Sequence, residues 1–330
     1  MNTLRTSHAH RNSPRPLVIA HRGACAYLPE HTLAAKALAY GMGADYLEQD
    51  VVMSKDEQLI VLHDVTLDRT TNVAQVFPER RRKDARFYAI DFTLDELLQL
   101  QLNEAVVEAG GRLVPQYPGR FPLYKSNFKI HTLADEIELA QGLNISSGRA
   151  VGIYPEIKRP DFHRENGKDL AMALLSELKR YGYTNKDDSI FVQTFDFQEL
   201  KRLRETLMPE LGIDLKLVQL IANDEEGRRL TSPSGLKEVA RYADAIGPEK
   251  DMILSFEQSP NRPVASPLLR HAKELGLAIH PYTFRADQGL VPPYVNSFDE
   301  LLALFVEELG IDGLFTDFTD KLVAYLNLNS

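Results

Sequence analysis

Residues 18–64 read VIAHRGACAYLPEHTLAAKALAYGMGADYLEQDVVMSKDEQLIVLHD, and the organisation of the rest of the chain follows from this stretch. His21 and Arg22 come directly after one apolar run. Glu48 and Asp50 lie two residues apart on a second apolar run, and His63 ends a third. Short apolar runs that end in charged or imidazole side chains predict strands that deliver reactive groups to one site.

Beyond this stretch, short β-branched runs alternate with longer helical patterns, which is typical of repeated βα units around a parallel sheet. Strands are predicted at residues 17–20, 46–52, 152–157, 190–194, 215–221, 243–246, 277–280 and 313–315, with a further short run at 59–62. Helices are predicted at residues 32–40, 133–143, 169–181, 197–207, 236–242, 268–275, 298–309 and 321–326. The alternation predicts an α/β fold, a (β/α)8 TIM barrel that occupies residues 17–330.

The alternation is lost between about residues 64 and 130. Four prolines interrupt this region, and only residues 94–102 have a helical periodicity. A stretch of this length without βα units predicts an inserted small subdomain that packs on the barrel or covers it as a lid. Residues 1–16 have no apolar core and are predicted to form a disordered tail.

The composition is that of an ordinary globular protein, with 44% hydrophobic and 26% charged residues. A formal net charge of -9 argues against a nucleic-acid or anionic-membrane binder. No apolar run is long enough for a membrane span, and the N-terminus does not read as a secretory signal. The single cysteine, Cys25, excludes an internal disulfide, and we interpret it as a packing residue rather than a nucleophile.

Glu48 and Asp50 are at positions i and i+2, so a strand points both carboxylates to one face. Such a pair repels unless a cation neutralises it, and Glu156 can add a third oxygen from another strand. Three carboxylates without a thiolate favour Ca²⁺ or Mg²⁺ over zinc. The structural alternative is a set of interior carboxylates paired with Arg22 and Lys158.

His21 and His63 can divide the work of general acid and general base between them. A guanidinium and an ammonium, from Arg22 and Lys158, suit the non-bridging oxygens of a phosphate ester. This surplus of positive charge favours phosphoryl transfer over glycoside hydrolysis.

Polar residues also close the later predicted strands and should collect at the same rim of the barrel. They are Gln193, His280, Tyr282 and Asp317. Of these, Gln193 and Tyr282 are taken as candidates for substrate binding.

Four separated motifs then resemble one family, the glycerophosphodiester phosphodiesterases. They are HRGACAYLPEHT at residues 21–32, LEQD at 47–50, LHD at 62–64 and PEIK at 155–158. YPGRFP at 117–122, GIYPEIK at 152–158, HPYTFR at 280–285 and GLFTDF at 313–318 are similar to the bacterial periplasmic type. The resemblance covers about residues 17–326.

The resemblance implies a barrel with an insertion that binds one divalent cation, with Ca²⁺ preferred and Mg²⁺ the alternative. It implies that glycerophosphocholine, glycerophosphoethanolamine and similar esters are split into sn-glycerol 3-phosphate and an alcohol through a cyclic phosphate. The implied residues are Glu48, Asp50 and Glu156 for the cation, His21 and His63 as the acid-base pair, and Arg22 and Lys158 for the phosphate.

Three features depart from the family pattern, and one of them is the region at residues 223–235, which is shorter than in the periplasmic type. His31 stands where many members have Asn, a difference that the periplasmic type shares. The periplasmic type is exported with a signal peptide, which the chain as written does not show. The expected location is therefore cytoplasmic for the chain as written, and periplasmic if the chain is a processed form. The expected partner is a small-molecule substrate, without nucleic acid or a membrane span, and a homodimer is a possible assembly.

Two rival functions stay open at this point. A phospholipase of the phosphatidylinositol or sphingomyelin type would need an apolar or aromatic rim around its site to dock on a membrane. The absence of Trp and the net negative charge argue against this function. A non-catalytic barrel that binds a phosphorylated ligand would be expected to have lost a histidine or a carboxylate, and this chain keeps all five.

Overall fold

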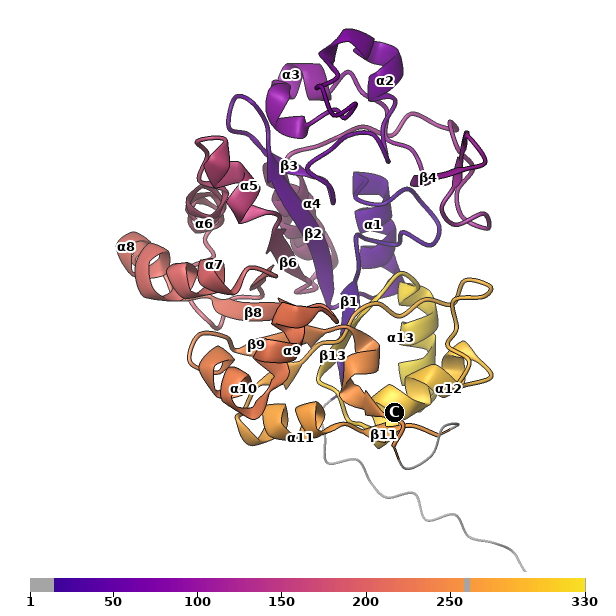
Figure 1. The fold of residues 1–330 in the computed structure, drawn as a ribbon, viewed down its shortest axis with the longest axis vertical. Coiled ribbons are helices and arrows are strands. Elements are labelled where there is room, and N and C mark those ends of the chain that lie inside the picture. The colour runs from indigo at the N-terminus through magenta and orange to yellow at the C-terminus, as the bar shows by residue number, and fades with distance from the viewer. Residues whose placement is uncertain (1–14, 258–261, 330) are drawn as a thin grey trace, which may run out of the picture.

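The computed structural model describes residues 15–257 and 262–329, and within these ranges eight parallel strands form a nearly closed ring (Figure 1). Around the ring they are β12 Ala278–Ile279, β9 Ala245–Pro248, β8 Lys216–Ile221, β7 Phe191–Thr194, β6 Gly152–Ile157, β2 Tyr46–Met53, β1 Leu17–Ala20 and β13 Gly313–Thr316. Asp312 N donates to Ile279 O (3.1 Å) and Phe315 N to Pro281 O (3.1 Å), which brings β13 beside β12. The predicted TIM barrel is confirmed, whereas most of the predicted tail lies outside the described residues.

Helices pack around the ring. They are α1 Leu33–Met42, α4 Leu133–Ser147, α6 Leu170–Arg180, α7 Phe197–Arg202, α8 Met208–Leu211, α10 Pro233–Val239, α11 Pro267–Glu274, α12 Phe298–Leu302 and α13 Thr319–Leu328. π-Helical turns at Leu203–Leu207 and Ala303–Glu308 continue α7 and α12, and two short helices that the sequence did not predict are α5 Pro160–Glu165 and α9 Glu225–Thr231. No helix within the described ranges is long and apolar enough to cross a membrane.

The first βα unit shows how local sequence sets these boundaries. The Thr32 side chain accepts a hydrogen bond from Ala35 N, which begins α1 with an N-cap. The helix continues through Gly41 and ends at Gly43, whose φ of 100° closes it in the left-handed region. In the loop before the helix, a Cβ on Gly23 would lie 2.8 Å from the carbonyl carbon of Ala35, so only glycine fits there.

Two apolar layers hold the barrel. Inside the ring, a small cluster of apolar side chains consists of Ile19, Tyr154, Phe191, Val218, Ala245 and Phe315. The rings of Tyr154 and Phe191 stack with centroids 4.9 Å apart. A much larger cluster lies between the strands and the outer helices. Together these layers leave the carboxyl ends of the strands for polar residues.

The region between β2 and α4 carries its own short elements, of which Figure 1 shows α2, α3 and β4 beyond the end of β2. They are β3 Leu59–Val61, α2 Val73–Val76, α3 Leu94–Leu97, β4 Val106–Ala109 and β5 Arg112–Pro115, with 3₁₀ turns at Pro78–Arg80 and Ala89–Asp91. They surround a separate apolar cluster that includes Phe87, Phe92, Leu97 and Ile130. This cluster supports our proposal that residues 64–130 form an inserted subdomain.

Two sequence expectations in this region need correction. The run at 59–62 is a strand, but β3 pairs antiparallel with β2, so it belongs to a hairpin outside the ring. The helix predicted at 94–102 ends at Leu97, although Thr93 and Glu96 form a capping box at its start. It cannot continue because Leu102 N donates to Phe128 O (2.9 Å), which draws the chain into an extended bridge.

Glu104 in the inserted segment gives a prediction about pH. Its side chain is 3% exposed and its Oε2 has no hydrogen-bond partner among the described residues. Burial raises the pKa of Glu104 from 4.5 to about 8, although Arg120 opposes the shift. The folded protein therefore keeps this proton up to about pH 8, whereas the unfolded chain releases it near pH 4.5. The stability that goes with it is complete below pH 4.5 and is lost as the pH rises towards 8.

Glu104→Gln should remove this loss. We expect the variant to be more stable than the wild type by about 1 to 3 kcal/mol at pH 8, and by less at pH 5. Urea unfolding of both proteins at the two pH values measures the difference. A difference that stays constant between pH 5 and 8 would contradict the assigned titration.

Candidate active site

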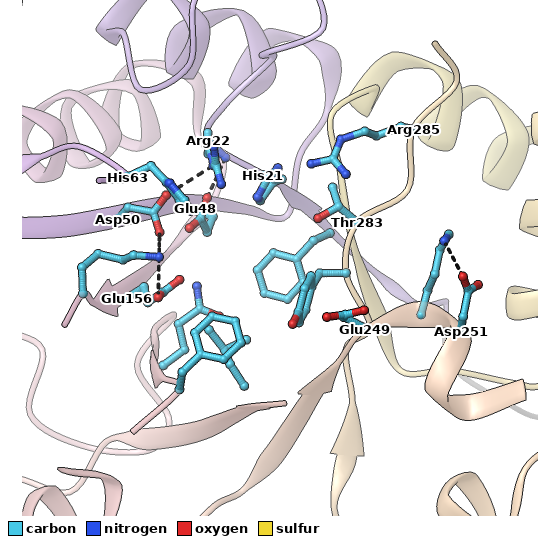
Figure 2. A pocket seen from close by; sticks show the side chains of 17 residues that line it. His21, Arg22, Glu48, Asp50, His63, Glu156, Glu249, Asp251, Thr283 and Arg285 are labelled. Atoms are coloured by element: carbon cyan, nitrogen blue, oxygen red, sulfur yellow. Dashed lines mark hydrogen bonds and ion pairs between the residues drawn. The ribbon is translucent and has the colours of Figure 1, made fainter. Parts of the chain in front are cut away.

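The nine predicted site residues all line one cavity of about 310 Å³ at the carboxyl ends of the strands. They are His21, Arg22, Glu48, Asp50, His63, Glu156, Lys158, Gln193 and Tyr282. Figure 2 shows Arg22, Glu48, Asp50 and His63 gathered on one side with Glu156 beside them, and Arg285 and Glu249 across the cavity. The barrel therefore brings together the residues that sequence reasoning selected, while their roles stay predictions.

The carboxylates lie on two neighbouring strands. Asp50 on β2 is in register with Glu156 on β6. Glu48 Oε2 accepts a hydrogen bond from Arg22 N (2.6 Å). Lys158 Nζ lies 2.8 Å from Glu156 Oε1 and 3.4 Å from Asp50 Oδ1, and so bridges the two strands.

Arg22 and Lys158 only partly balance the negative charge of the three carboxylates, and two of these groups have raised pKa values. Burial and the charge of Asp50 raise the pKa of Glu48 well above its usual value. Burial likewise raises the pKa of Glu156 to about 8, against the opposing effect of Lys158. Buried carboxyl groups that resist ionisation are those that a bound cation would stabilise in the charged form.

The cluster fits a divalent cation. Ligand atoms of His31, Glu48 and Asp50 all lie within 4.8 Å of one another. Asp50 Oδ1 is buried, and its contact among the described residues is the 3.4 Å ion pair with Lys158 rather than a hydrogen bond. A donor set of carboxylate oxygens without a thiolate suits Ca²⁺ or Mg²⁺. Sequence reasoning had noted His31 only as a departure from the family pattern, yet His31 Nε2 lies 2.7 Å from Asp50 Oδ2.

A second group, formed by His21, Cys25 and Asp317, has the spacing of metal ligands but not the free atoms. His21 Nδ1 lies 2.7 Å from Asp317 Oδ1, and both Arg120 and Arg285 bind Asp317 Oδ2. Burial raises the pKa of the Cys25 thiol well above its usual value. His21 Nδ1 and Asp317 are already bonded, and Cys25 Sγ donates to the backbone carbonyl of His21 (3.1 Å), which argues against a cation there.

Both histidines present the same side to the cavity. His21 Nδ1 is bonded to Asp317, and His63 Nδ1 lies 2.6 Å from Asp64 Oδ1. A carboxylate at Nδ1 fixes the proton there, so the Nε2 lone pair of each ring is available to a substrate. Burial, followed by the charge of Arg22, lowers the pKa of His21 to about 4 and also lowers the pKa of His63. Both rings are therefore neutral near pH 7 before a substrate binds.

Arg22 lines the site and has a left-handed backbone conformation, with φ of 57°. Its Nη1 lies 2.8 Å from Glu30 Oε2, and its Nε is 3.3 Å from Asp50 Oδ2. These contacts hold the guanidinium beside the carboxylates rather than in solvent. The positive φ of Arg22 strains the backbone, and strain of this kind occurs at functional sites.

Gln193 and Tyr282 approach the cavity in different ways. Gln193 Oε1 is buried without a hydrogen-bond partner among the described residues, so this amide can bind a ligand. The Tyr282 hydroxyl already donates to Ile221 O (3.1 Å), and its ring lies against Phe195 with centroids 5.9 Å apart. Tyr282 can therefore offer its aromatic ring rather than its hydroxyl.

His280 does not lie at the rim, contrary to expectation. It is 1% exposed inside the barrel, where its Nδ1 lies 2.9 Å from the Tyr154 hydroxyl. Sequence reasoning also missed several cavity residues: Phe195, Leu220, Glu249, Lys250, Asp251, Thr283, Arg285 and Phe315. Phe195 and Glu249 directly follow β7 and β9, so the strand-end rule could have found them.

A second cavity of about 340 Å³ lies between the barrel mouth and the inserted segment. It shares four residues with the first: His21, Arg22, His63 and Arg285. Its other walls include Arg69, Gln116, Tyr117 and Arg120 from the inserted segment. The two histidines therefore stand between two spaces, one rich in carboxylates and one lined by the insertion.

Comparison with known proteins gives a consistent result. The model of the glycerophosphoryl diester phosphodiesterase family matches residues 21–321. The glycerophosphodiester phosphodiesterase of Haemophilus influenzae is 46% identical over 327 residues, which cover 94% of this chain and 89% of the relative. That of Treponema pallidum is 40% identical over 327 residues, covering 94% and 91%. A solved structure of an Oleispira antarctica phosphodiesterase matches with a TM-score of 0.62 at 22% identity, covering 95% of this chain and 97% of the other, and bears on the fold alone.

Proposed function

Because the chain belongs to the glycerophosphoryl diester phosphodiesterase family, we propose that its cavity hydrolyses small glycerophosphodiesters with the help of a divalent cation. The substrates would be esters such as glycerophosphocholine and glycerophosphoethanolamine, and the products sn-glycerol 3-phosphate and the free alcohol. The Oleispira antarctica phosphodiesterase was solved in complex with the product sn-glycerol 3-phosphate, and we extend that product to this chain.

One observation carries the proposal. Two neutral histidines, each with Nδ1 held by an aspartate, line one cavity together with Arg22 and Lys158. This arrangement offers two Nε2 atoms for proton transfer and two cations for the oxygens of a phosphodiester. The non-catalytic binding barrel loses its support, because the curated relatives are enzymes and none of the five candidate groups is missing.

In the proposed reaction, the glycerol 2-hydroxyl attacks phosphorus as one histidine Nε2 takes its proton. The bond from phosphorus to the alcohol oxygen breaks, and the other histidine, which would take up a proton from solvent at Nε2 when the anionic ester binds, donates that proton to the oxygen. In the second step water attacks the cyclic phosphate, the bond from phosphorus to O2 breaks, and the histidines exchange roles. The residues that do not transfer protons would hold the ester in place: Arg22 and Lys158 at its non-bridging oxygens, and Gln193 and Tyr282 beside its organic parts.

We further propose Glu48, Asp50 and Glu156 as ligands of the cation, with His31 adjacent. When bound, the cation would neutralise these carboxylates and withdraw charge from a non-bridging phosphate oxygen. Lys158 would then be shared between the carboxylates and the phosphate.

We expect EDTA to abolish the release of glycerol 3-phosphate from glycerophosphocholine, and Ca²⁺ to restore it more fully than Mg²⁺. The reason is that Glu48 and Glu156, whose pKa values are raised, need a cation to be ionised beside an anionic ester. The product is measured by coupled oxidation of glycerol 3-phosphate, with and without EDTA and after each ion is added back.

Release that EDTA leaves unchanged would rule out the metal-dependent reaction. An intact phospholipid serves as a parallel substrate. Cleavage of the phospholipid without cleavage of any glycerophosphodiester would favour the phospholipase function instead.

A further inference from the structure

We propose that the inserted segment positions both active-site histidines, through Arg69 and Arg120, which fix the aspartates that hold His21 and His63. The insertion would then be part of the catalytic apparatus rather than a lid over it. This inference rests on the proposed function, since it assumes that the two histidines transfer protons.

The first half of the arrangement concerns His21. Its partner Asp317 is 1% exposed and uses one oxygen, Oδ1, for His21 Nδ1 (2.7 Å). The other oxygen, Oδ2, accepts from Arg120 Nη2 (2.6 Å) and from Arg285 Nε (2.8 Å). A carboxylate whose second oxygen is bound by two guanidinium groups cannot turn, so the first oxygen stays aimed at the imidazole.

The second half repeats this pattern at His63. Asp64 Oδ1 lies 2.6 Å from His63 Nδ1, and Asp64 Oδ2 accepts from Arg69 Nε (2.8 Å). Arg69 Nη2 also donates to Glu30 Oε1 (2.8 Å), and Glu30 Oε2 binds Arg22 Nη1 (2.8 Å). The same arginine of the insertion therefore fixes one histidine and supports the guanidinium proposed to bind phosphate.

Residues of the insertion join the two halves. Arg69 Nη1 donates to Gln116 Oε1 (3.0 Å), and Gln116 Nε2 donates to the Tyr117 hydroxyl (3.3 Å). The Arg120 guanidinium lies over the Tyr117 ring, 3.8 Å from its centroid. The two arginines are thus parts of one connected set, and a shift of the insertion would disturb both histidines together.

Attachment of the insertion to the barrel does not explain this arrangement by itself. Arg120 already makes two bonds to Asp287, Nε to Oδ1 (2.9 Å) and Nη2 to Oδ2 (2.8 Å), which fasten the segment. The contact with Asp317 is additional, and it places a buried guanidinium against the one carboxylate that orients His21. Burial alone would raise the pKa of Asp317, but Arg285, His21 and Arg120 keep it well below its usual value, so the carboxylate stays ionised.

The test compares Arg120→Gln and Arg69→Gln with Arg82→Gln. Arg82 is the matched control because it also lies in the insertion and makes two bonds to a carboxylate, to Asp91 (2.6 and 2.7 Å), outside both cavities. We expect kcat on glycerophosphocholine to fall about 10- to 100-fold in the first two variants. KM should change far less in Arg120→Gln, whereas Arg69→Gln should also raise KM, because Arg69 supports Arg22 through Glu30. Arg82→Gln should keep the wild-type kcat.

Coupling separates positioning from a loss of structure. In an Asp317→Asn background, which already disturbs the His21 tautomer, Arg120→Gln should add little further loss of kcat. Arg69→Gln should behave in the same way in an Asp64→Asn background.

A nitrophenyl ester of glycerol phosphate gives a second test, because its nitrophenolate leaving group departs without a proton. On that ester, the variant that disturbs the acid histidine should regain most of its rate, whereas the variant that disturbs the base should not.

Arg120→Lys keeps the charge but not the planar fork, and it provides a second variant if Arg120→Gln does not fold; we expect a smaller loss of kcat in the same sense. The inference is overturned if the wild type is active and both arginine variants keep kcat within about two-fold, a change smaller than the effect of a lost orienting contact. It is also overturned if their losses persist undiminished in the aspartate variants. An inactive wild type would instead overturn the proposed function.

Discussion

Replacing His21 or His63 by Ala is expected to lower kcat on glycerophosphocholine by about 10²- to 10⁴-fold in each single variant. Each ring lines the cavity and has Nδ1 occupied by an aspartate, so its Nε2 is the atom that can exchange a proton with the ester. The losses should not multiply in the double variant, because groups that act in one step are not independent. KM should change little, since Arg22 and Lys158 remain to hold the phosphate.

His271→Ala is the control. His271 lies on α11, on the outside of the barrel and away from both cavities. Its activity should equal that of the wild type. If either His21→Ala or His63→Ala retained more than about a tenth of the wild-type kcat, that histidine would not be a proton-transfer group. Thermal unfolding of each variant shows whether a loss of activity reflects a loss of fold.

The largest expected change in stability comes from Glu136→Ala. Glu136 on α4 is fully buried, and its Oε1 accepts from Lys36 Nζ (2.7 Å) and from Gln49 Nε2 (2.7 Å). Its Oε2 lies 2.9 Å from His131 Nε2. Removing the carboxylate leaves the buried ammonium of Lys36 without a counter-charge, which costs about 3 to 5 kcal/mol. Urea unfolding at pH 7 measures the loss.

Two further variants serve as a control and as a rescue for Glu136→Ala. Glu138→Ala changes an exposed residue of the same helix and should alter the free energy of unfolding by about 0.5 kcal/mol or less. Lys36→Met combined with Glu136→Leu removes both charges and should recover most of the stability lost by Glu136→Ala. A loss below about 1 kcal/mol in Glu136→Ala would mean that Lys36 finds another partner or water.

Glu136→Ala should also affect the site. Lys36 Nζ donates to the backbone carbonyl of Glu48, so the buried pair lies directly behind the strand that carries Glu48 and Asp50. After EDTA treatment, Glu136→Ala should lower the activity regained at limiting Ca²⁺ more than the activity regained at saturating Ca²⁺. The reason is that the predicted ligands Glu48 and Asp50 would be less well ordered without the Lys36–Glu136 pair.

The barrel could be predicted from the sequence because each βα unit carries its own signals. The Thr32 cap, the left-handed Gly43 and the apolar run of β2 are local features, and eight such units admit few other architectures. The nine predicted residues that line the cavity followed largely from one geometric rule, that parallel strands end at a common rim. His280 escaped the rule because its side chain points into the packed interior.

The inserted segment could not be predicted in the same way. Its bridges join residues distant in sequence, such as Leu102 with Phe128, and its short elements lack a period. The β4–β5 hairpin had a readable signal, since Gly110 and Gly111 form its two-residue turn with φ of 57° and 73°. Arg69 had no such signal, and the YPGRFP motif around Arg120 did not reveal which distant aspartate its arginine would bind.

β2 runs past the barrel rim and continues into the hairpin with β3, whose residues also belong to the core of the inserted segment. Val52 and Ile60 face each other across this hairpin and are both fully buried in that core. One continuous strand thus carries the predicted cation ligands at one end and the floor of the insertion at the other. A chimera that exchanges the insertion between relatives should therefore take its junctions before Val52 and after Ile130, because a cut at residue 64 would separate the graft from half of its own floor.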